Sequence, residues 1–148
     1  MPLIDLTFPT GSLPDKQQVG EELTTALLRA ERAPDTDFFR SITWAYLHEL
    51  PAENVLRAGA PADPPVFRVE ATVPQGALSD RRKQEFVEAA TAVLKDAAGV
   101  GDEDLIRIWV LVNEVPEGNW GAAGNVIHFE QLREAAKAER EKAAEPVS

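Results

Sequence analysis

The fold is decided by two matching stretches of sequence, Thr7-Phe8-Pro9-Thr10-Gly11-Ser12-Leu13-Pro14-Asp15 and Thr72-Val73-Pro74-Gln75-Gly76-Ala77-Leu78-Ser79-Asp80. Thr, Pro, Gly, Leu and Asp recur at the same places, and Thr72 lies 65 positions after Thr7. The same offset pairs residues further along: Trp44 with Trp109, Glu49 with Glu114, Pro51 with Pro116, Asn54 with Asn119, and Ala58-Gly59 with Ala123-Gly124. Self-similarity at a fixed period marks a repeated structural unit, so the chain is predicted to contain one unit twice.

Each unit reads as strand, turn, helix and strand. In the first unit, residues 3–8 alternate apolar and polar side chains, as a half-buried strand does. Gly and Pro mark a turn over residues 9–14. An apolar stripe at three- and four-residue spacing predicts a helix over residues 15–32, which Pro34 ends. Aromatic and aliphatic side chains predict a second strand over residues 42–50.

The second unit repeats this order. Residues 67–73 read as its first strand, and Ser79 is placed to cap a helix over residues 80–98. Residues 105–112 are apolar apart from Arg107, which predicts a strand that is buried on both faces. After a short strand over residues 125–129, the Ala- and Glu-rich residues 131–144 predict an exposed helix.

A strand-helix-strand unit places its two strands parallel with a right-handed crossover. Two units therefore predict an α/β fold, with a four-stranded mixed sheet and two helices on one face. We expect residues 1–59 to form the first unit, 60–65 a linker, 66–129 the second unit, and 130–148 a C-terminal helix with a disordered tail at 145–148. The uncovered sheet face, predicted to be apolar, favours self-association into a homo-oligomer.

Composition excludes several classes of function. The net charge of −10 argues against a general nucleic-acid binder and against binding to an anionic membrane surface. The chain has no cysteine and two histidines, which leaves too few ligands for a thiolate or multi-histidine metal site. It has no signal peptide pattern and no apolar run of about 18 residues, so we expect a cytoplasmic location and no membrane span. A small anionic substrate remains compatible with this charge.

Pro2 is the sharpest candidate for catalysis. Once Met1 is removed, Pro2 carries a free secondary amine, and α-amino groups have a pKa of about 8. Burial among apolar side chains disfavours the ammonium form and lowers that pKa. The result is a base that works near neutral pH, as removal of a proton next to a carbonyl requires.

The chain resembles the tautomerase superfamily over about residues 2–129. The resemblance rests on Met1-Pro2-Leu3-Ile4, on the Gly11-Ser12 turn, and on Glu114-Val115-Pro116-Glu117-Gly118-Asn119-Trp120-Gly121-Ala122-Ala123-Gly124. The best-known members of this superfamily are 4-oxalocrotonate tautomerase (4-OT) and macrophage migration inhibitory factor. The fused repeat is similar to malonate semialdehyde decarboxylase and cis-3-chloroacrylic acid dehalogenase.

This resemblance implies several roles. It implies catalysis by Pro2 without a cofactor, assembly as a homotrimer, and an apolar pocket wall at Trp120. The catalytic aspartate of the decarboxylase branch falls on Asp37. Asn119 recurs as Asn54, which favours a structural turn residue over a substrate contact.

The chain departs from the superfamily where arginines usually bind the substrate carboxylate. Ser12 stands at one of these places, and Trp44 and Trp109, which are themselves candidate substrate contacts, stand at another. Strand alternation would place Arg40 on the same face as Trp44, and Arg107 on the same face as Trp109. Arg40 and Arg107 are therefore the remaining candidates for binding an anionic substrate, with a surface or inter-subunit ion pair as the alternative.

The sequence predicts a cofactor-free tautomerase that moves a proton alpha to a carbonyl of a small 2-oxo acid or enol, with Pro2 as the base. One alternative is a cofactor-free hydratase, dehalogenase or decarboxylase, in which a second polar group such as Asp37 or Glu114 activates water. The other alternative is a non-catalytic oligomeric binding module, which the missing arginines favour.

Overall fold

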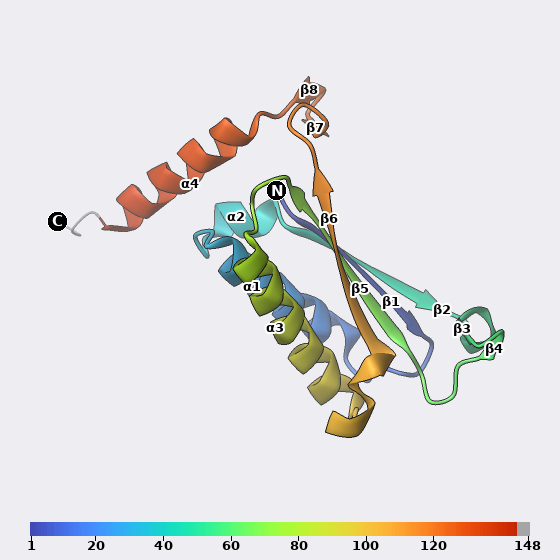
Figure 1. The fold of residues 1–148 in the computed structure, drawn as a ribbon. Helices are drawn as coiled ribbons and strands as arrows, with labels where there is room; N and C mark the ends of the chain where they lie inside the picture. Colours follow the sequence, from blue (N-terminus) through green and yellow to red (C-terminus); the bar gives the residue numbers. More distant parts are fainter. Residues whose placement is uncertain (145–148) are drawn as a thin grey trace.

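The computed structural model describes residues 1–144, and the predicted disordered tail, residues 145–148, lies outside the described residues. A four-stranded mixed sheet forms the centre of the molecule, with the strand order β2-β1-β5-β6 (Figure 1). The strands are β1 (Leu3–Pro9), β2 (Trp44–Leu50), β5 (Phe67–Pro74) and β6 (Ile108–Val115). The pairs β1–β2 and β5–β6 are parallel, and β1 pairs antiparallel with β5. The predicted fold class is confirmed.

Helices α1 (Lys16–Glu31) and α3 (Asp80–Ala98) pack side by side on one face of this sheet (Figure 1). Each begins at a side-chain cap: Asp15 accepts a hydrogen bond from the backbone nitrogen of Gln18, and Ser79 accepts one from that of Arg82. Gly99 ends α3 in the left-handed conformation. Arg32 adopts this conformation at the end of α1, with φ of 58°, so the helix ends before Pro34 is reached.

The two units agree in hydrogen bonding as well as in sequence. Leu3 lies opposite Trp44, and 65 positions further on, Arg68 lies opposite Trp109. The backbone nitrogen of Thr10 donates to the Leu50 carbonyl, and that of Gln75 donates to the Val115 carbonyl, each at 2.8 Å. The offset of 65 found in the sequence is therefore the offset of the folded units.

Each unit also carries short elements, most of which the sequence did not predict. A two-stranded hairpin follows each second strand: β3 (Leu56–Arg57) with β4 (Ala60–Pro61), and β7 (Gly121–Ala122) with β8 (Asn125–Val126). Of these four strands, β8 was predicted as residues 125–129, and it is shorter than predicted. The first hairpin takes up the beginning of the predicted linker, residues 60–65. The remaining short elements are α2 (Asp37–Ser41) and the 3-10 helices η1 (Ala52–Asn54) and η2 (Asp102–Arg107).

The hydrophobic core lies between the sheet and the two helices. The sheet contributes the alternate residues that point toward the helices, such as Ile4, Leu6 and Phe8 on β1. Phe86 of α3 and Leu23 of α1 are fully buried against them. The predicted alternation of β1 and the predicted helix stripes are borne out by these contacts.

The opposite face of the sheet is open, and it is less apolar than predicted. Its two edge strands carry Trp44 and Trp109, whose side chains are each 61% exposed. Between these edges the central strands present polar residues, among them Asp5 and Glu70. The prediction that residues 105–112 are buried on both faces is wrong, because β6 is an edge strand that helices cover on one side only.

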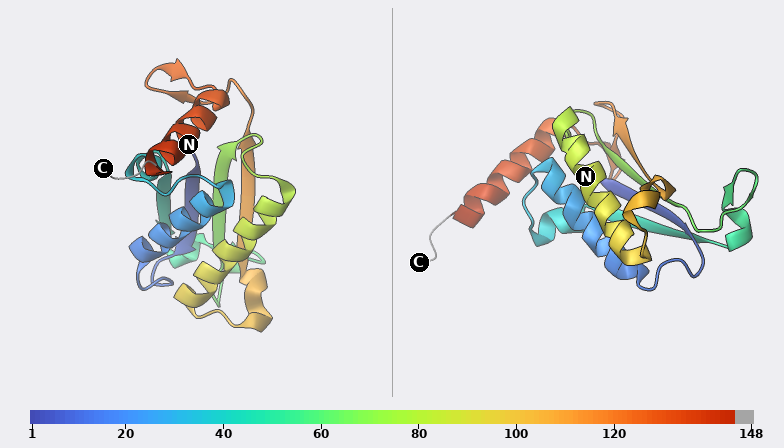
Figure 2. Two further views of the ribbon diagram at one scale, coloured as in Figure 1. Left: turned by 90° about the vertical axis from the view of Figure 1, so that its left-hand side faces the viewer. Right: turned by 60° about the horizontal axis from the view of Figure 1, so that its bottom comes forward.

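The C-terminal helix α4 (Phe129–Ala144) lies outside the repeat. It starts near the β7–β8 hairpin and crosses the end of the molecule that holds the N-terminus and α2 (Figures 1 and 2). Phe129 at its start is buried, whereas most of its other residues are exposed. None of the helices within residues 1–144 combines the length and the apolar character that crossing a membrane requires.

Candidate active site

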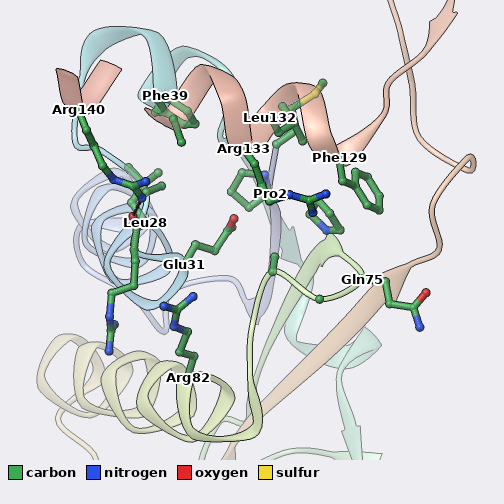
Figure 3. Close-up of a pocket in the computed structure, with 17 residues that line it drawn as sticks. Pro2, Leu28, Glu31, Phe39, Gln75, Arg82, Phe129, Leu132, Arg133 and Arg140 are labelled. Carbon is green, nitrogen blue, oxygen red and sulfur yellow. Dashed lines mark hydrogen bonds between the residues drawn. The ribbon is translucent and has the colours of Figure 1, made fainter. Parts of the chain in front are cut away.

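A cavity of about 340 Å³ lies at the N-terminal end of β1. Its walls come from the end of α1, from Phe39 of α2, from the turn after β5, from Arg82 of α3, and from α4 (Figure 3). This volume suits a small molecule, because binding pockets range from about 300 to 1,000 Å³. The first residues of one unit and the turn of the other unit meet here because β1 and β5 run antiparallel.

Pro2 lies in this cavity and is buried. Its carbonyl accepts a hydrogen bond from the backbone nitrogen of Trp44 at 3.2 Å, which anchors the residue to β2. Met1 precedes Pro2 in the described chain and also lines the cavity. Burial lowers the pKa of the terminal amine below its usual 8.0, while the nearby Glu31 carboxylate acts in the opposite direction. This amine belongs to Met1, so the lowered pKa predicted for a free Pro2 nitrogen stays a prediction.

Among the described residues 1–144, Glu31 is the one acidic residue that lines this cavity. It is the last residue of α1, and in Figure 3 its carboxyl group points from the helix toward Pro2. The residue as a whole is partly exposed, but its Oε1 is buried and has no hydrogen-bond partner. Burial raises the pKa of this carboxyl from 4.5 to about 7, against the attraction of the terminal amine.

Four arginines surround the same cavity, so the site is locally basic in an acidic protein: Arg32, Arg82, Arg133 and Arg140. Two of them have partners. Arg32 forms an ion pair with Glu85 at 2.9 Å, and Arg140 donates to the Arg32 carbonyl. Within the described part of the chain, the side chains of Arg82 and Arg133 form neither ion pairs nor hydrogen bonds. Both guanidinium groups are therefore available to an anionic ligand.

Three residues predicted for the site lie elsewhere in the chain. Asp37 is exposed at the first turn of α2. Arg40 and Arg107 are not on the strands as predicted, because α2 and η2 take their places. Arg40 pairs with Asp35 at 2.6 Å and lowers the pKa of that carboxyl, while Arg107 pairs with Asp104 at 3.1 Å and donates to the Pro65 carbonyl. These contacts match the ion-pair alternative for both arginines.

The other predicted residues do not line this cavity within one chain. Trp44 and Trp109 are on the open sheet face, as the alternation predicted. Trp120 is partly buried beside the β7–β8 hairpin, where its carbonyl accepts a hydrogen bond from Ile127. Asn119 is exposed, and its backbone nitrogen donates to Pro116 as that of Asn54 does to Pro51. Their substrate-binding roles stay predictions.

The sequence did contain signals for the residues that were missed. Glu31 follows Leu27 and Leu28 at four- and three-residue spacing, so it extends the buried face of α1. Phe129, Leu132 and Ala136 form a short apolar stripe on α4, which marks a helix that packs against something. Arg133 and Arg140 are the polar neighbours of that stripe.

Residues 1–144 contain no cluster of three or more His, Asp or Glu side chains that would suit a metal ion. The described residues that line the cavity include an amine, a carboxyl group and guanidinium groups.

Comparison with known proteins agrees with this architecture. The model of the family described as "Tautomerase enzyme" matches residues 65–130. No curated protein sequence matches the chain. A structure of Pt0534 inactivated by 2-oxo-3-pentynoate has a TM-score of 0.72 at 20% identity, covering 88% of this chain and 98% of that chain.

Two further structures have the same fold. A fused 4-OT described as a symmetric trimer has a TM-score of 0.69 at 20% identity, covering 88% of this chain and 98% of that one. The protein N1, a member of the cis-3-chloroacrylic acid dehalogenase family, has a TM-score of 0.70 at 23% identity, covering 97% of this chain and 92% of that one.

Two fused β-α-β units with Pro2 in a cavity at their junction define the tautomerase class of fold. The chain has the fold of the fused two-unit tautomerases, and its second unit matches the tautomerase family model, so the predicted resemblance is confirmed.

Proposed function

We propose that this protein is a cofactor-free tautomerase that moves a proton alpha to the carbonyl of a small 2-oxo acid or enol. The observation that carries the proposal is the burial of Pro2 in a cavity where burial lowers the pKa of the neighbouring Met1 amine. An amine that is neutral near pH 7 accepts a proton from substrate without first losing its own. The match of residues 65–130 to the tautomerase family model supports an enzyme of this general type.

Removal of Met1 is part of the proposal. While Met1 is present, the Pro2 nitrogen belongs to an amide, whose lone pair is delocalised into the carbonyl group. Because Met1 lines the cavity, its removal frees the ring nitrogen and also opens space beside it. Substrate then occupies the volume next to the new amine.

The arginines support an anionic substrate. Arg82 and Arg133 reach the cavity from α3 and α4, on different sides of it (Figure 3). Guanidinium groups bind carboxylates through charge-assisted hydrogen bonds, often two at once. Phe39 and Phe129 provide apolar walls that suit an aryl or alkyl group. Phenylenolpyruvate combines a carboxylate, an enol and an aryl ring, and is the probe that fits this arrangement.

We therefore expect the mature protein to convert phenylenolpyruvate into its keto form. Replacing Arg82 or Arg133 by Ala is expected to raise KM about tenfold or more, because a hydrogen bond to a charged group is worth about 1.5–3 kcal/mol. The measurement is the initial rate of absorbance change over a range of substrate concentrations. Arg81→Ala is the matched control, because Arg81 is in the same turn of α3 but its side chain is 88% exposed.

Two results would contradict this function. The first is that the protein turns over no enol and no unsaturated acid, although its intact mass shows that Pro2 is free. That result would favour the binding module. The second is that the protein acts only on unsaturated or 3-oxo acids, which favours a hydratase, dehalogenase or decarboxylase. Labelling with 2-oxo-3-pentynoate tests the Pro2 amine separately, because a free amine at Pro2 is expected to add one molecule of this electrophile.

We further propose that the protein assembles as a homotrimer through the open sheet face. Related folds are described as trimers, and Trp44 and Trp109 leave large apolar side chains exposed on this face. We expect light scattering to give a trimer mass, and Trp109→Arg to shift it toward the monomer, because a charge there resists burial. Arg81→Ala is again the control, and a wild-type monomer at all concentrations would refute the assembly.

A further inference from the structure

Glu31 lines the cavity, but the proposed removal of a proton by Pro2 gives it no role. Its Oε1 is buried without a hydrogen-bond partner, and its side chain points toward Pro2 (Figure 3). Buried polar groups with a purely structural role are almost always hydrogen-bonded. A carboxyl oxygen left unpartnered at the wall of a cavity has its free lone pairs and its proton available to a ligand.

The charged groups around Glu31 come from several elements. The terminal amine faces it from the start of β1, Arg82 from α3, Arg32 from the end of α1, and Arg133 and Arg140 from α4. Phe39 of α2 and the turn after β5 contribute no charge. No described ion pair within 4.0 Å includes Glu31. Glu31 is therefore in a basic cavity without being neutralised by a fixed partner.

The protonation of Glu31 differs from that of an ordinary carboxylate. Burial raises its pKa to about 7, and burial lowers the pKa of the terminal amine, which Met1 carries in the described chain. Both shifts favour the uncharged forms, a neutral amine and a protonated carboxyl group. One group is then ready to accept a proton and the other to donate one.

We propose that Glu31 is a second catalytic acid–base group, which gives a proton to the substrate while Pro2 takes another. This inference rests on the proposed function of Pro2. With an enol, the Pro2 nitrogen takes the hydroxyl proton, so that the O–H bond breaks and the carbonyl forms. The electron pair of the C=C bond then takes the carboxyl proton of Glu31 to form a C–H bond. The resulting ammonium returns its proton to the Glu31 carboxylate, and no proton is gained or lost.

This two-group route makes a prediction that a one-group route does not. Activity of the wild type requires Pro2 to be neutral and Glu31 to be protonated, so kcat/KM against pH is expected to be bell-shaped around neutrality. The apparent pKa values of the two limbs belong to the coupled pair of groups rather than to single residues. Glu31→Gln keeps the shape of the side chain but cannot give up a proton as an acid. We expect it to lower kcat by about a hundredfold or more and to remove the alkaline limb.

Two other variants complete the test. Glu31→Asp keeps the acid and is expected to restore part of kcat together with the alkaline limb. Asp96→Asn is the matched control, because Asp96 lies 65 positions after Glu31 in the second unit and is exposed, so its kcat is expected to be that of the wild type. If Glu31→Gln keeps both the wild-type kcat and the alkaline limb, Glu31 carries no proton and the inference is overturned.

Labelling by 2-oxo-3-pentynoate separates this outcome from failure of the proposed function. If only the role of Glu31 is wrong, the wild type still turns over phenylenolpyruvate and Pro2 is still labelled. If the proposed function is wrong, the wild type neither turns over the enol nor gains the label at Pro2. A loss of kcat in Glu31→Gln with Pro2 still labelled supports the second acid–base group.

Discussion

A chain that keeps any residue in front of Pro2 is expected to lose its tautomerase activity by about 10²–10⁴-fold or more, the usual contribution of a general base. The reason is electronic, because an amide nitrogen does not accept a proton at cellular pH. The structure adds a steric reason, since the residue that precedes Pro2 lies in the cavity itself.

The experiment compares three preparations of the same protein. The first carries a cleavable tag before Pro2, the second is the first after cleavage to leave Pro2 at the terminus, and the third carries its tag after Ser148, beyond α4. Rates on phenylenolpyruvate and intact masses are measured for all three. Only the last two are expected to be active. Equal rates before and after cleavage would show that the base is not the Pro2 nitrogen.

Glu31→Gln is expected to make the protein more stable above pH 7, although it damages the proposed site. In the unfolded chain Glu31 loses its proton near its ordinary pKa of 4.5, whereas in the folded chain it keeps the proton up to about pH 7. Between these values the folded state holds more protons, so the contribution of Glu31 to stability falls as pH rises. The difference in pKa corresponds to a cost of about 3 kcal/mol above pH 7.

Thermal unfolding of both proteins at a fixed protein concentration measures this cost. At pH 8 the Glu31→Gln variant is expected to have a Tm several degrees above that of the wild type, and near pH 4.5 this advantage is expected to vanish. Asp96→Asn, which removes an exposed carboxylate, is expected to show no such dependence. A Glu31→Gln variant that is less stable than the wild type at pH 8 would mean that the carboxylate is stabilised in the fold.

The parts of the fold that the sequence predicted well are those governed by periodicity. The alternation in β1, the apolar stripes of α1 and α3, and the cap at Ser79 are local patterns, and each reports directly on backbone conformation. The repeat at an offset of 65 then supplied the topology, because two equal units joined in one sheet leave few arrangements. The elements that were missed, such as α2 and the β3–β4 hairpin, are too short to show a period.

The site was harder to predict because its residues come from segments far apart in the sequence. Pro2 could be identified alone, since its chemistry depends on being next to the chain terminus. Glu31 and Arg133 could not, because their importance depends on the end of α1 and on α4 meeting at the same cavity. Arg40 and Arg107 were placed on strands by extending an alternation past the residues where those strands begin.

At the offset of 65, helix α4 corresponds to residues 64–79, where the described chain has β5 and a turn in place of a helix. The two units are therefore unequal: the first contributes Pro2 to the cavity, and the second contributes the turn after β5, Arg82 and the helix α4 that follows it. Most of α4 is exposed and none of it belongs to the core between the sheet and the helices. Sequence changes in α4 are therefore expected to alter the cavity more than the stability of the fold.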